Sequence, residues 1–542
     1  MNLPSKLHSP LAKWADAFLQ GGDASSLFAR NAIWRDYLAF AWDLQSFEGL
    51  ETITAALPND VGDHLRVIET PSPHEIMFSF TARHGSVKAL AEIHDGHCTR
   101  LFTSLEDMAV PNLADDNRID GNAPEVLIIG AGQSGLALAA QLQRLAVPYL
   151  VAEQNDRVGD NWRNRYDSLI LHDPVWVNHL PFKPFPDEWP TFTPKDKMGD
   201  WLEDYANDLS LNIRCHTTIS AARFDEERSL WQITANDNGK TDTFTVPHIV
   251  FAVGTSGFAH MPEIDGATCY KGKQIHSSAY RSGAAFAGQS VTIIGATNSA
   301  HDIAVDLVKH GAMPTLIQRS STHVVPHQLY VNDILAPLYA PQHNRALADA
   351  DFLSVATPMR HLEDKGRAIF DKAQDTWKDF YQSLTNTGFA LDFAEDGSGI
   401  IGKYRRSASG YYINVGGSEQ VINGAISVKT GKGIKAITPD GIRLDDNSEI
   451  ASDAIIYATG FGSMEEWVAR LIDQKTADKI GRCWGYGSGY RGDPGPWEGE
   501  LRNMWKPTPQ QGLWFMGGNL AQVRIYSRYL AMQLCHHIQE TN

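Results

Sequence analysis

Cysteine is scarce in this chain, and its few copies are scattered. A dispersed and odd-numbered set gives no support to a disulfide framework or a cysteine zinc site, and it fits a reducing cytoplasm. The segment Cys535-His536-His537 groups metal-ligand residue types, but consecutive residues on a helix point in different directions, so we expect no metal site. The five cysteines among the 542 residues form no CxxC pair; they are Cys98, Cys215, Cys269, Cys483 and Cys535.

Positive charge and long apolar runs are also lacking. Lys and Arg number 47 against 64 Asp and Glu, a net charge of −17. Because an acidic surface repels phosphate backbones, we expect no nucleic-acid partner. No apolar run is long enough to span a bilayer, and the first residues lack the apolar core of a signal peptide, so we expect no membrane partner and a cytoplasmic location. The globular composition and the length favour two or three domains.

The order of strand-like and helical segments divides the chain. Residues 1–118 predict a small α+β domain that ends in a polar linker rich in Pro, Asp and Asn. Beyond it, uninterrupted apolar strands are followed by glycine-rich turns and helices, which is typical of parallel-sheet units. The sequence therefore predicts an α/β fold with two Rossmann-like dinucleotide-binding domains. We assign 119–283 and 425–542 to the first domain, and 284–424, with a helical insertion, to the second.

A glycine-rich turn with the pattern GxGxxG opens the first of these domains. It lies between an apolar strand and a helix, which is the context that the motif requires. Gly130 permits the tight turn, Gly132 lets a pyrophosphate approach the backbone, and Gly135 lets helix and strand pack closely. Glu153 ends the next strand, 23 residues after Gly130, where an acid holds the hydroxyls of an unphosphorylated ribose. The unit predicts an FAD or NAD site.

Two features favour FAD at this site. The segment 159–163 (GDNWR) directly follows the acid, where flavin enzymes fold chain over the cofactor. Two later strands end in small residues near Gly254 and near Thr459-Gly460, and small residues let a ligand come close to the backbone. Asn519, after a further strand, is expected to make the last contact with the flavin.

A second unit repeats this layout with two changes. The turn that begins at Gly295 carries Thr297 and Ala300 where the pattern has glycines, and Thr297 narrows the approach of a pyrophosphate, although its hydroxyl can donate to it. Arg319 stands where the first unit has Glu153, and a basic residue there suits a ribose with a 2′-phosphate. The unit predicts an NADPH site; a structural unit with a surface arginine is the alternative.

Residues 270–280 (YKGKQIHSSAY), between the two units, resemble the fingerprint of class B flavoprotein monooxygenases in its flavin-containing monooxygenase form. Tyr270 replaces the leading Phe, and Tyr280 stands where Baeyer–Villiger monooxygenases have Trp. His172 takes the place of the family's usual active-site Asn, which is similar to the plant YUCCA and the bacterial type II enzymes. The resemblance covers about residues 120–542, and the N-terminal segment resembles the SnoaL-like cone fold.

This resemblance implies an FAD- and NADPH-dependent monooxygenase, and NADH is also possible as the reductant. Such an enzyme uses a flavin hydroperoxide to insert one atom of molecular oxygen into a small organic substrate. It leaves N- or S-oxygenation, Baeyer–Villiger oxidation of a ketone, and a homodimer open. His172, Asn298 and His276 are the implied catalytic residues, and His276 is expected to fix the linker between domains or to be a structural histidine.

Other functions compete with this interpretation of the motifs. A non-catalytic flavin-binding sensor and an NADPH oxidase stay open, whereas a pyridine-nucleotide–disulfide reductase needs a redox cysteine pair that the chain lacks. The residues expected to hold the two cofactors are Gly130, Gly132, Ser134, Gly135, Glu153, Gln154, Trp162, Arg163, His172, Ile219, Gly254, Gly295, Thr297, Asn298, Ser299, Arg319, Ser320, Thr459, Gly460 and Asn519.

Overall fold

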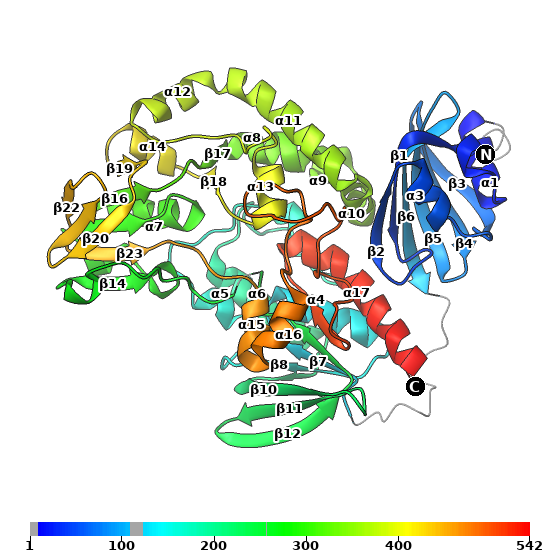
Figure 1. Ribbon diagram of the computed structural model, residues 1–542, viewed down its shortest axis with the longest axis horizontal. Helices are drawn as coiled ribbons and strands as arrows, with labels where there is room; N and C mark the ends of the chain where they lie inside the picture. Colours follow the sequence, from blue (N-terminus) through cyan, green and yellow to red (C-terminus); the bar gives the residue numbers. More distant parts are fainter. Residues whose placement is uncertain (1–8, 109–122, 256, 542) are drawn as a thin grey trace.

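The computed structural model describes residues 9–108, 123–255 and 257–541, which form three regions (Figure 1). An N-terminal sheet stands to one side, and two parallel sheets with their helices make up the rest. The predicted domain boundary at residue 118 and most of the predicted linker lie outside the described residues. Within the described ranges, no helix is long and apolar enough to cross a membrane.

The N-terminal region is a six-stranded sheet in the order β2-β1-β6-β5-β4-β3, in which only β1 and β6 run parallel. The Ser9 hydroxyl caps its first helix, which buries Trp14 and Phe18 against Phe28 and Phe80 of the sheet. The predicted α+β character is confirmed, and the SnoaL-like resemblance stays a prediction. The elements are α1 (Pro10–Leu19), α2 (Ala24–Leu27), β1 (Phe28–Tyr37), β2 (Leu44–Glu48), α3 (Leu50–Ala56), β3 (Asp63–Ser72), β4 (Glu75–Ala82), β5 (Gly85–His94) and β6 (His97–Met108).

The first parallel sheet has the order β24-β13-β7-β8-β9. All residues of β7, β8, β13 and β24 are buried, as expected for strands covered on both faces. An antiparallel sheet of β10, β11 and β12 adjoins it. The elements are β7 (Val126–Ile129), α4 (Gln133–Arg144), β8 (Tyr149–Ala152), α5 (Asp160–Arg163), η3 (Val175–Val177), α6 (Lys195–Asp208), β9 (Ile213–Arg214), β10 (Thr217–Asp225), β11 (Leu230–Asp237), β12 (Lys240–Val246), β13 (His248–Phe251), α15 (Glu465–Leu471), α16 (Gln474–Ile480), β24 (Leu513–Phe515) and α17 (Leu520–Thr541).

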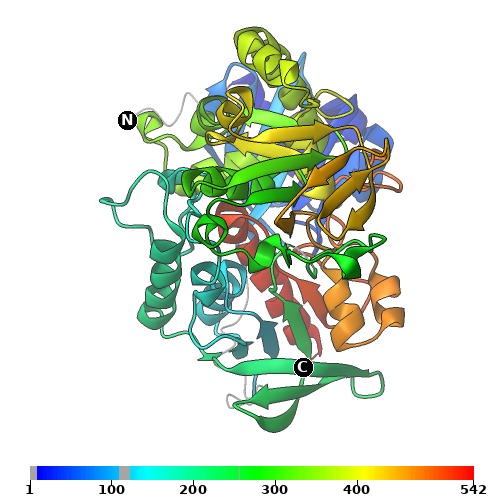
Figure 2. The same ribbon diagram turned by 90° about the vertical axis from the view of Figure 1, so that its left-hand side faces the viewer.

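The second parallel sheet has the order β14-β23-β15-β16-β19, and several helices lie between β17 and β18 along the chain. In both views it lies above the first sheet, with β10 to β12 below (Figures 1 and 2). Its elements are η4 (Ala267–Cys269), β14 (Lys273–His276), η5 (Ser277–Ala279), η6 (Gly283–Phe286), β15 (Ser290–Ile294), α7 (Asn298–Lys309), β16 (Met313–Gln318), β17 (His323–Pro326), α8 (His327–Leu329), η7 (Tyr330–Leu335), α9 (Ala336–Tyr339), η8 (Pro341–His343), α10 (Leu347–Ala356), α11 (Met359–Thr376), α12 (Lys378–Asn386), α13 (Ile400–Ser407), β18 (Tyr411–Asn414), α14 (Gly417–Ile422), β19 (Ser427–Thr430), β20 (Ile434–Thr438), β21 (Gly441–Leu444), β22 (Glu449–Ala451) and β23 (Ala454–Tyr457).

The second sheet extends beyond the range 284–424 that the sequence analysis assigned to it. Strand β14 comes from the segment 119–283, and β19 and β23 come from 425–542. The predicted limits were set at the glycine turns. The sheet, however, contains strands on both sides of β15, and some of these strands come from outside the predicted range. Strand β23 lies between β14 and β15, so the chain enters and leaves this region through neighbouring strands.

A buried ion pair joins the N-terminal region to the rest of the molecule. The Arg35 guanidinium, 1% exposed, donates to both carboxylate oxygens of Glu500, at 2.6 and 2.7 Å. Tyr37 and Ser46 also donate to Glu500, at 2.9 and 2.7 Å. Burial acts to lower the pKa of Arg35, but the Glu500 carboxylate outweighs it, and the pKa lies well above the ordinary value. A buried charge that is paired with a carboxylate therefore lies inside this junction.

We expect Glu500→Gln to weaken the junction strongly, because it leaves the Arg35 charge buried without a carboxylate. The cost in free energy of unfolding should be about 3–5 kcal/mol. Urea unfolding followed by tryptophan fluorescence should show an earlier loss of the N-terminal region. Arg443→Gln is the control, because its pair with Glu449 is exposed and should contribute less than about 1 kcal/mol. Equal unfolding midpoints for the two variants would contradict the expectation.

Candidate dinucleotide-binding site

Glycines gather where three neighbouring strands of the first sheet end. Gly130 follows β7, Gly254 follows β13 and Gly517 follows β24, and these strands are adjacent and parallel. Gly130 has a φ of +105°, and a Cβ on it would lie 2.8 Å from the Ala252 carbonyl oxygen. A Cβ on Gly517 would lie 3.2 Å from a methyl carbon of Thr255. The carboxyl edge of this sheet therefore carries no side chain at these three positions, and helix α4 directs its N-terminus there.

The glycine turn contains one glycine that the packing of the protein requires and one that it does not require. The second glycine fits a bound dinucleotide. A Cβ on Gly135 would lie 2.0 Å from the Gly130 carbonyl oxygen, so helix α4 can pack here only with glycine. A Cβ on Gly132 would meet only the side chain of Asn161, at 3.2 Å from its amide nitrogen. The protein itself therefore does not demand glycine at 132. The space serves a close approach of pyrophosphate to the backbone.

Glu153 lies directly beside this turn. One of its carboxylate oxygens accepts from the Ala131 amide at 2.7 Å, and the other accepts from the backbone and side-chain amides of Asn155 at 2.8 and 2.7 Å. The side chain is 6% exposed. The acid is therefore held in place at the end of β8, where the hydroxyls of an adenosine ribose need an acceptor.

Other predicted contacts of this site have partners within the protein. The Trp162 indole donates to the Gln133 side chain at 3.2 Å, next to the glycine turn. Asn519 caps α17 and exchanges hydrogen bonds with Gln522. Ser134 is buried in the first turn of α4, Ile219 is buried on β10, and Gln154 is exposed. The Arg163 guanidinium pairs with Asp160 of its own helix α5 (2.8 Å) and holds α5 against α6 through Asp200 (2.8 Å) and Glu203 (2.9 Å).

A cavity of about 820 Å³ opens at the carboxyl edge of the second sheet. A Cβ on Gly295, whose φ is +131°, would lie 2.3 Å from the Ala458 carbonyl oxygen, the counterpart of the contact at Gly130. Strand β23 belongs to this second sheet, and the expectation that the small residues after it approach the first cofactor stays a prediction. The predicted cofactor residues that line the cavity are Gly295, Thr297, Arg319, Ser320, Thr459 and Gly460.

The walls of this cavity are rich in positive charge. Lys403 pairs with Asp392 at 2.7 Å, and Lys432 pairs with Asp446 at 3.4 Å. Arg319 has no carboxylate partner among the described residues, so its guanidinium is available to pair with a phosphate. Sequence reasoning missed Lys403 and Lys432 because they lie far from the motif along the chain, in α13 and next to β20.

Asn298 and Ser299 do not line the cavity. The Asn298 side chain accepts from the Ile413 amide at 2.9 Å and so ties α7 to β18. In this structure Asn298 therefore stabilises the wall of the second site. Its predicted contact with a nicotinamide stays a prediction.

His276 holds the end of β23 in place. Its Nδ1 accepts from the Ser278 amide at 3.1 Å, which leaves Nε2 to donate to the Gly460 carbonyl oxygen at 3.0 Å. Burial lowers the pKa of His276, which favours this neutral form. Gly460 lines the second cavity, so His276 acts on that cavity through the backbone, in keeping with the predicted role at a junction.

His172 lies where the two dinucleotide-binding regions meet. Its Nε2 is 3.8 Å from a carboxylate oxygen of Asp302 on α7, and the Tyr166 hydroxyl donates to the same oxygen at 2.6 Å. The His172 carbonyl oxygen accepts from His327 at 2.9 Å. Burial raises the pKa of Asp302, and His172 and Tyr166 oppose that rise. Sequence reasoning missed Asp302, because nothing in the helix sequence marks it.

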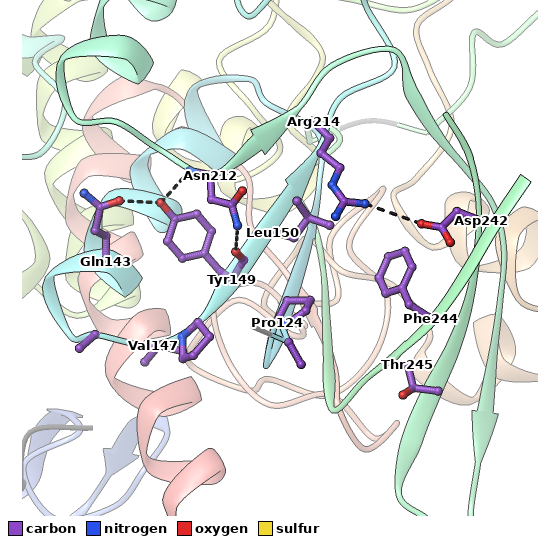
Figure 3. A pocket seen from close by; sticks show the side chains of 13 residues that line it. Pro124, Gln143, Val147, Tyr149, Leu150, Asn212, Arg214, Asp242, Phe244 and Thr245 are labelled. Atoms are coloured by element: carbon purple, nitrogen blue, oxygen red, sulfur yellow. Dashed lines mark hydrogen bonds and ion pairs between the residues drawn. The ribbon is translucent and has the colours of Figure 1, made fainter. Parts of the chain in front are cut away.

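A second hollow, of about 730 Å³, lies at the opposite, amino edge of the first sheet (Figure 3). The Tyr149 hydroxyl donates to Gln143 at 2.9 Å, Asn212 donates to the Tyr149 carbonyl at 2.7 Å, and Arg214 pairs with Asp242 at 3.7 Å. These polar groups satisfy one another, and both glycine turns lie at the other edges. We assign this hollow no part in the site.

We expect Gly132→Ala to reduce dinucleotide binding without unfolding the protein. The added methyl group meets one flexible amide in the fold but enters the space of the pyrophosphate. The dissociation constant for FAD, measured by titration of the apoprotein, should rise at least about tenfold, the equivalent of one lost charged hydrogen bond. Gly239→Asn, in the open turn between β11 and β12, is the control. Unchanged affinity in Gly132→Ala would remove this glycine from the site.

The chain is similar to several known proteins. The family model described as pyridine nucleotide-disulphide oxidoreductase matches residues 127–400. Indole-3-pyruvate monooxygenase YUCCA1 of Oryza sativa subsp. japonica is 30% identical over 361 residues, which are 66% of this chain and 82% of that protein. The probable indole-3-pyruvate monooxygenase YUCCA8 of Arabidopsis thaliana is 38% identical over 208 residues, 38% of this chain and 49% of that protein.

Solved structures share the fold. A flavin-containing monooxygenase from Stenotrophomonas maltophilia matches with a TM-score of 0.51 and 18% identity, over 76% of this chain and 98% of that one. OTEMO in complex with FAD and NADP matches with a TM-score of 0.54 and 17% identity, over 77% of this chain and 86% of that one. These matches confirm the predicted arrangement of two dinucleotide-binding domains.

The family's name includes a disulphide that this chain does not form. All five cysteines are free, so the reductase chemistry behind that name has no thiol pair here. The family model matches half of the chain, and the rice enzyme is similar over most of its length. Both findings confirm the resemblance to flavin-dependent monooxygenases. The chain belongs to the pyridine nucleotide-disulphide oxidoreductase family, on its flavin-dependent monooxygenase branch.

Proposed function

We propose that this protein is an FAD- and NADPH-dependent monooxygenase that transfers one atom of molecular oxygen to a small organic molecule. The observation that carries the proposal is a pair of glycine turns at the carboxyl edges of two parallel sheets, one beside a buried acid and one beside an unpaired arginine. An acid suits the plain ribose of FAD, and a free cation suits the 2′-phosphate of NADPH. We infer a cytoplasmic location from the five free cysteines, and a homodimer stays a prediction.

Bound FAD supplies the activation of oxygen, for which side chains have no equivalent. The chain's own residues bind, orient and exclude water. Glu153 would accept from the adenosine ribose, the N-terminus of α4 would face the pyrophosphate, and Arg319 would pair with the 2′-phosphate of the second cofactor. His276 holds the wall of the second cavity at Gly460.

His172 is the side chain proposed to act where the cofactors meet. Asp302 and Tyr166 lie behind it, and the Tyr166 hydroxyl proton is directed at Asp302. The Asp302 carboxylate lies 3.8 Å from the His172 imidazole, and its proposed role is to orient that imidazole at the junction. The names of the plant relatives, which refer to indole-3-pyruvate, favour a carbonyl-bearing substrate over an amine or a sulfide.

Purified protein mixed with NADPH under air tests the proposal. We expect a yellow protein whose flavin absorbance bleaches on addition of NADPH, and oxygen uptake that rises with a substrate from a panel of ketones, sulfides and amines. Product identification should find one added oxygen atom. A yellow protein inert to both NADH and NADPH would be a sensor. Oxygen uptake that yields hydrogen peroxide with every compound would make it an NADPH oxidase.

Arg319→Gln should raise the KM for NADPH about 10- to 100-fold, because a charged contact to the 2′-phosphate is lost. The KM for NADH should change little, since that cofactor lacks the phosphate. Steady-state oxidation of both cofactors measures the difference, with the exposed Arg443→Gln as the control. Parallel changes for NADPH and NADH would assign Arg319 a structural role.

His172→Asn should change the fraction of oxidised NADPH that ends as hydrogen peroxide. Asp302→Asn should move that fraction in the same direction by a smaller amount, because it acts through the orientation of His172. The measurement compares NADPH consumed, peroxide formed and product formed across pH. Coupling that stays unchanged in both variants would remove the pair from the mechanism.

A further inference from the structure

We propose that the N-terminal region holds one wall of the second cavity in place, so that its contacts set how tightly the protein binds the nicotinamide cofactor. This inference rests on the cofactor site proposed above and assigns a role to the N-terminal region. It starts from one loop, residues 485–502 between α16 and β24, which contacts both the cavity and the N-terminal sheet. We call it the bridging loop.

Hydrogen bonds join the two limbs of the bridging loop. The Glu498 amide of the second limb donates to the Tyr486 carbonyl oxygen of the first limb at 2.9 Å. The buried Asp493 carboxylate accepts from the Gly487 amide at 2.9 Å and from the Arg502 guanidinium at 3.1 Å. Because each limb is bonded to the other, a contact made by one limb also constrains the other.

The tip of the bridging loop forms part of the cavity wall. Tyr490, Arg491 and Gly492 line the same cavity as Arg319. The Tyr490 ring faces the guanidinium of Arg406, whose central carbon lies 4.0 Å from the ring centre, and Arg406 also lines the cavity. The position of the tip therefore contributes to the shape of the space that the second cofactor would enter.

The second limb of the bridging loop packs on strands β1 and β2 of the N-terminal sheet. The Trp497 indole donates to the Glu48 carboxylate at 2.5 Å. Glu500 accepts from Arg35 at 2.6 Å and from Ser46 at 2.7 Å. Three side chains of the N-terminal sheet thus hold this limb.

Trp497 is also in contact with buried groups that lie behind the tip. Its ring meets the Tyr486 ring edge-on, with ring centres 5.0 Å apart. The Tyr486 hydroxyl donates to Glu363, and Arg406 donates to the same carboxylate oxygen. Tyr486, Glu363 and Arg406 are all buried, and Arg406 is the residue that faces Tyr490. A contiguous series of contacts therefore runs from strand β2 to the cavity wall.

The glycine content of the bridging loop makes its anchors important. Ordering a glycine costs more conformational entropy than ordering any other residue, so side-chain contacts must offset that cost if the loop is to keep one shape. Without the anchors, the tip would adopt the binding-competent shape for only a fraction of the time, and the apparent affinity for the cofactor would fall by that fraction. The glycines of the loop, all with positive φ, are Gly485, Gly487, Gly489, Gly492, Gly495 and Gly499.

Two glutamates of the N-terminal sheet provide a matched test. Glu48 pairs with Arg360 at 2.9 Å and Glu106 with Arg528 at 3.2 Å, and the two carboxylate side chains are 30% and 31% exposed. Glu48 also holds Trp497 of the bridging loop, whereas the partner of Glu106 belongs to α17. The two pairs thus make comparable contacts between the N-terminal region and the rest of the molecule, and they differ in whether the loop is involved.

Isothermal titration calorimetry on the flavin-loaded protein, with NADP⁺ as the probe, measures the affinity without turnover. We expect Glu48→Ala to raise the Kd for NADP⁺ about tenfold, because the loop loses a charged hydrogen bond, and Glu106→Ala to change it less than about twofold. The Kd for FAD should be the same in both variants. A merely structural role of Glu48 would lower the unfolding midpoint and leave the Kd for NADP⁺ unchanged.

A double-mutant cycle tests the route through the indole. Trp497→Ala should also weaken the binding of NADP⁺, and adding Glu48→Ala to it should cause no further loss, because Glu48 acts as a positioning residue through Trp497. Unchanged affinity in Glu48→Ala, equal losses in Glu48→Ala and Glu106→Ala, or additive losses in the double variant would each overturn the proposal.

The outcomes separate this proposal from the proposed function. NADP⁺ binding that does not depend on Glu48 would overturn the role of the N-terminal region alone. Binding that depends on Glu48, in a protein that takes up no oxygen with NADPH, would overturn the monooxygenase function alone. A wild-type protein that does not bind NADP⁺ would overturn both.

Discussion

The close approach of a glycine turn to the next strand is the constraint on which this structure depends. Gly130 and Gly295 both have positive φ values, and in each a side chain would collide with a carbonyl oxygen of the neighbouring strand, that of Ala252 or Ala458. The turn, the strand and the helix that follows can pack only without that side chain. The same contact in both sheets brings two helix N-termini to carboxyl edges, where phosphates are bound.

What distinguishes the two sheets is the charge placed beside each turn. Glu153 is locked by backbone amides in the first, and Arg319 has no partner within the described residues of the second. The whole chain is acidic, with a net charge of −17, so a cation without a carboxylate partner at the edge of a sheet is notable. Arg319, exposed on the wall of the second cavity, is the cation for which an external anion is the natural partner. An acidic exterior with local cations discourages non-specific binding of polyanions but still admits small anionic ligands.

The regions are joined by buried polar contacts that come from every part of the chain. Arg35 of the N-terminal sheet reaches Glu500, and Asp302 of α7 reaches His172 and Tyr166 of the first region. Such contacts contribute little stability relative to an apolar packing but fix one relative orientation, because misplacement leaves a charge unpaired. Orientation matters for a protein that must present two cofactors to each other.

Local sequence determined the motifs of this protein, and tertiary structure decided their partners. The glycine turns, Glu153 and Arg319 were predictable because strand, turn and helix lie within some twenty-five residues and follow from apolar runs and turn chemistry. The sheet that β23 joins ahead of Thr459 and the salt bridges that occupy Arg163 were not predictable. Strand order and side-chain pairing depend on residues hundreds of positions apart, and no local pattern encodes which carboxylate reaches which cation.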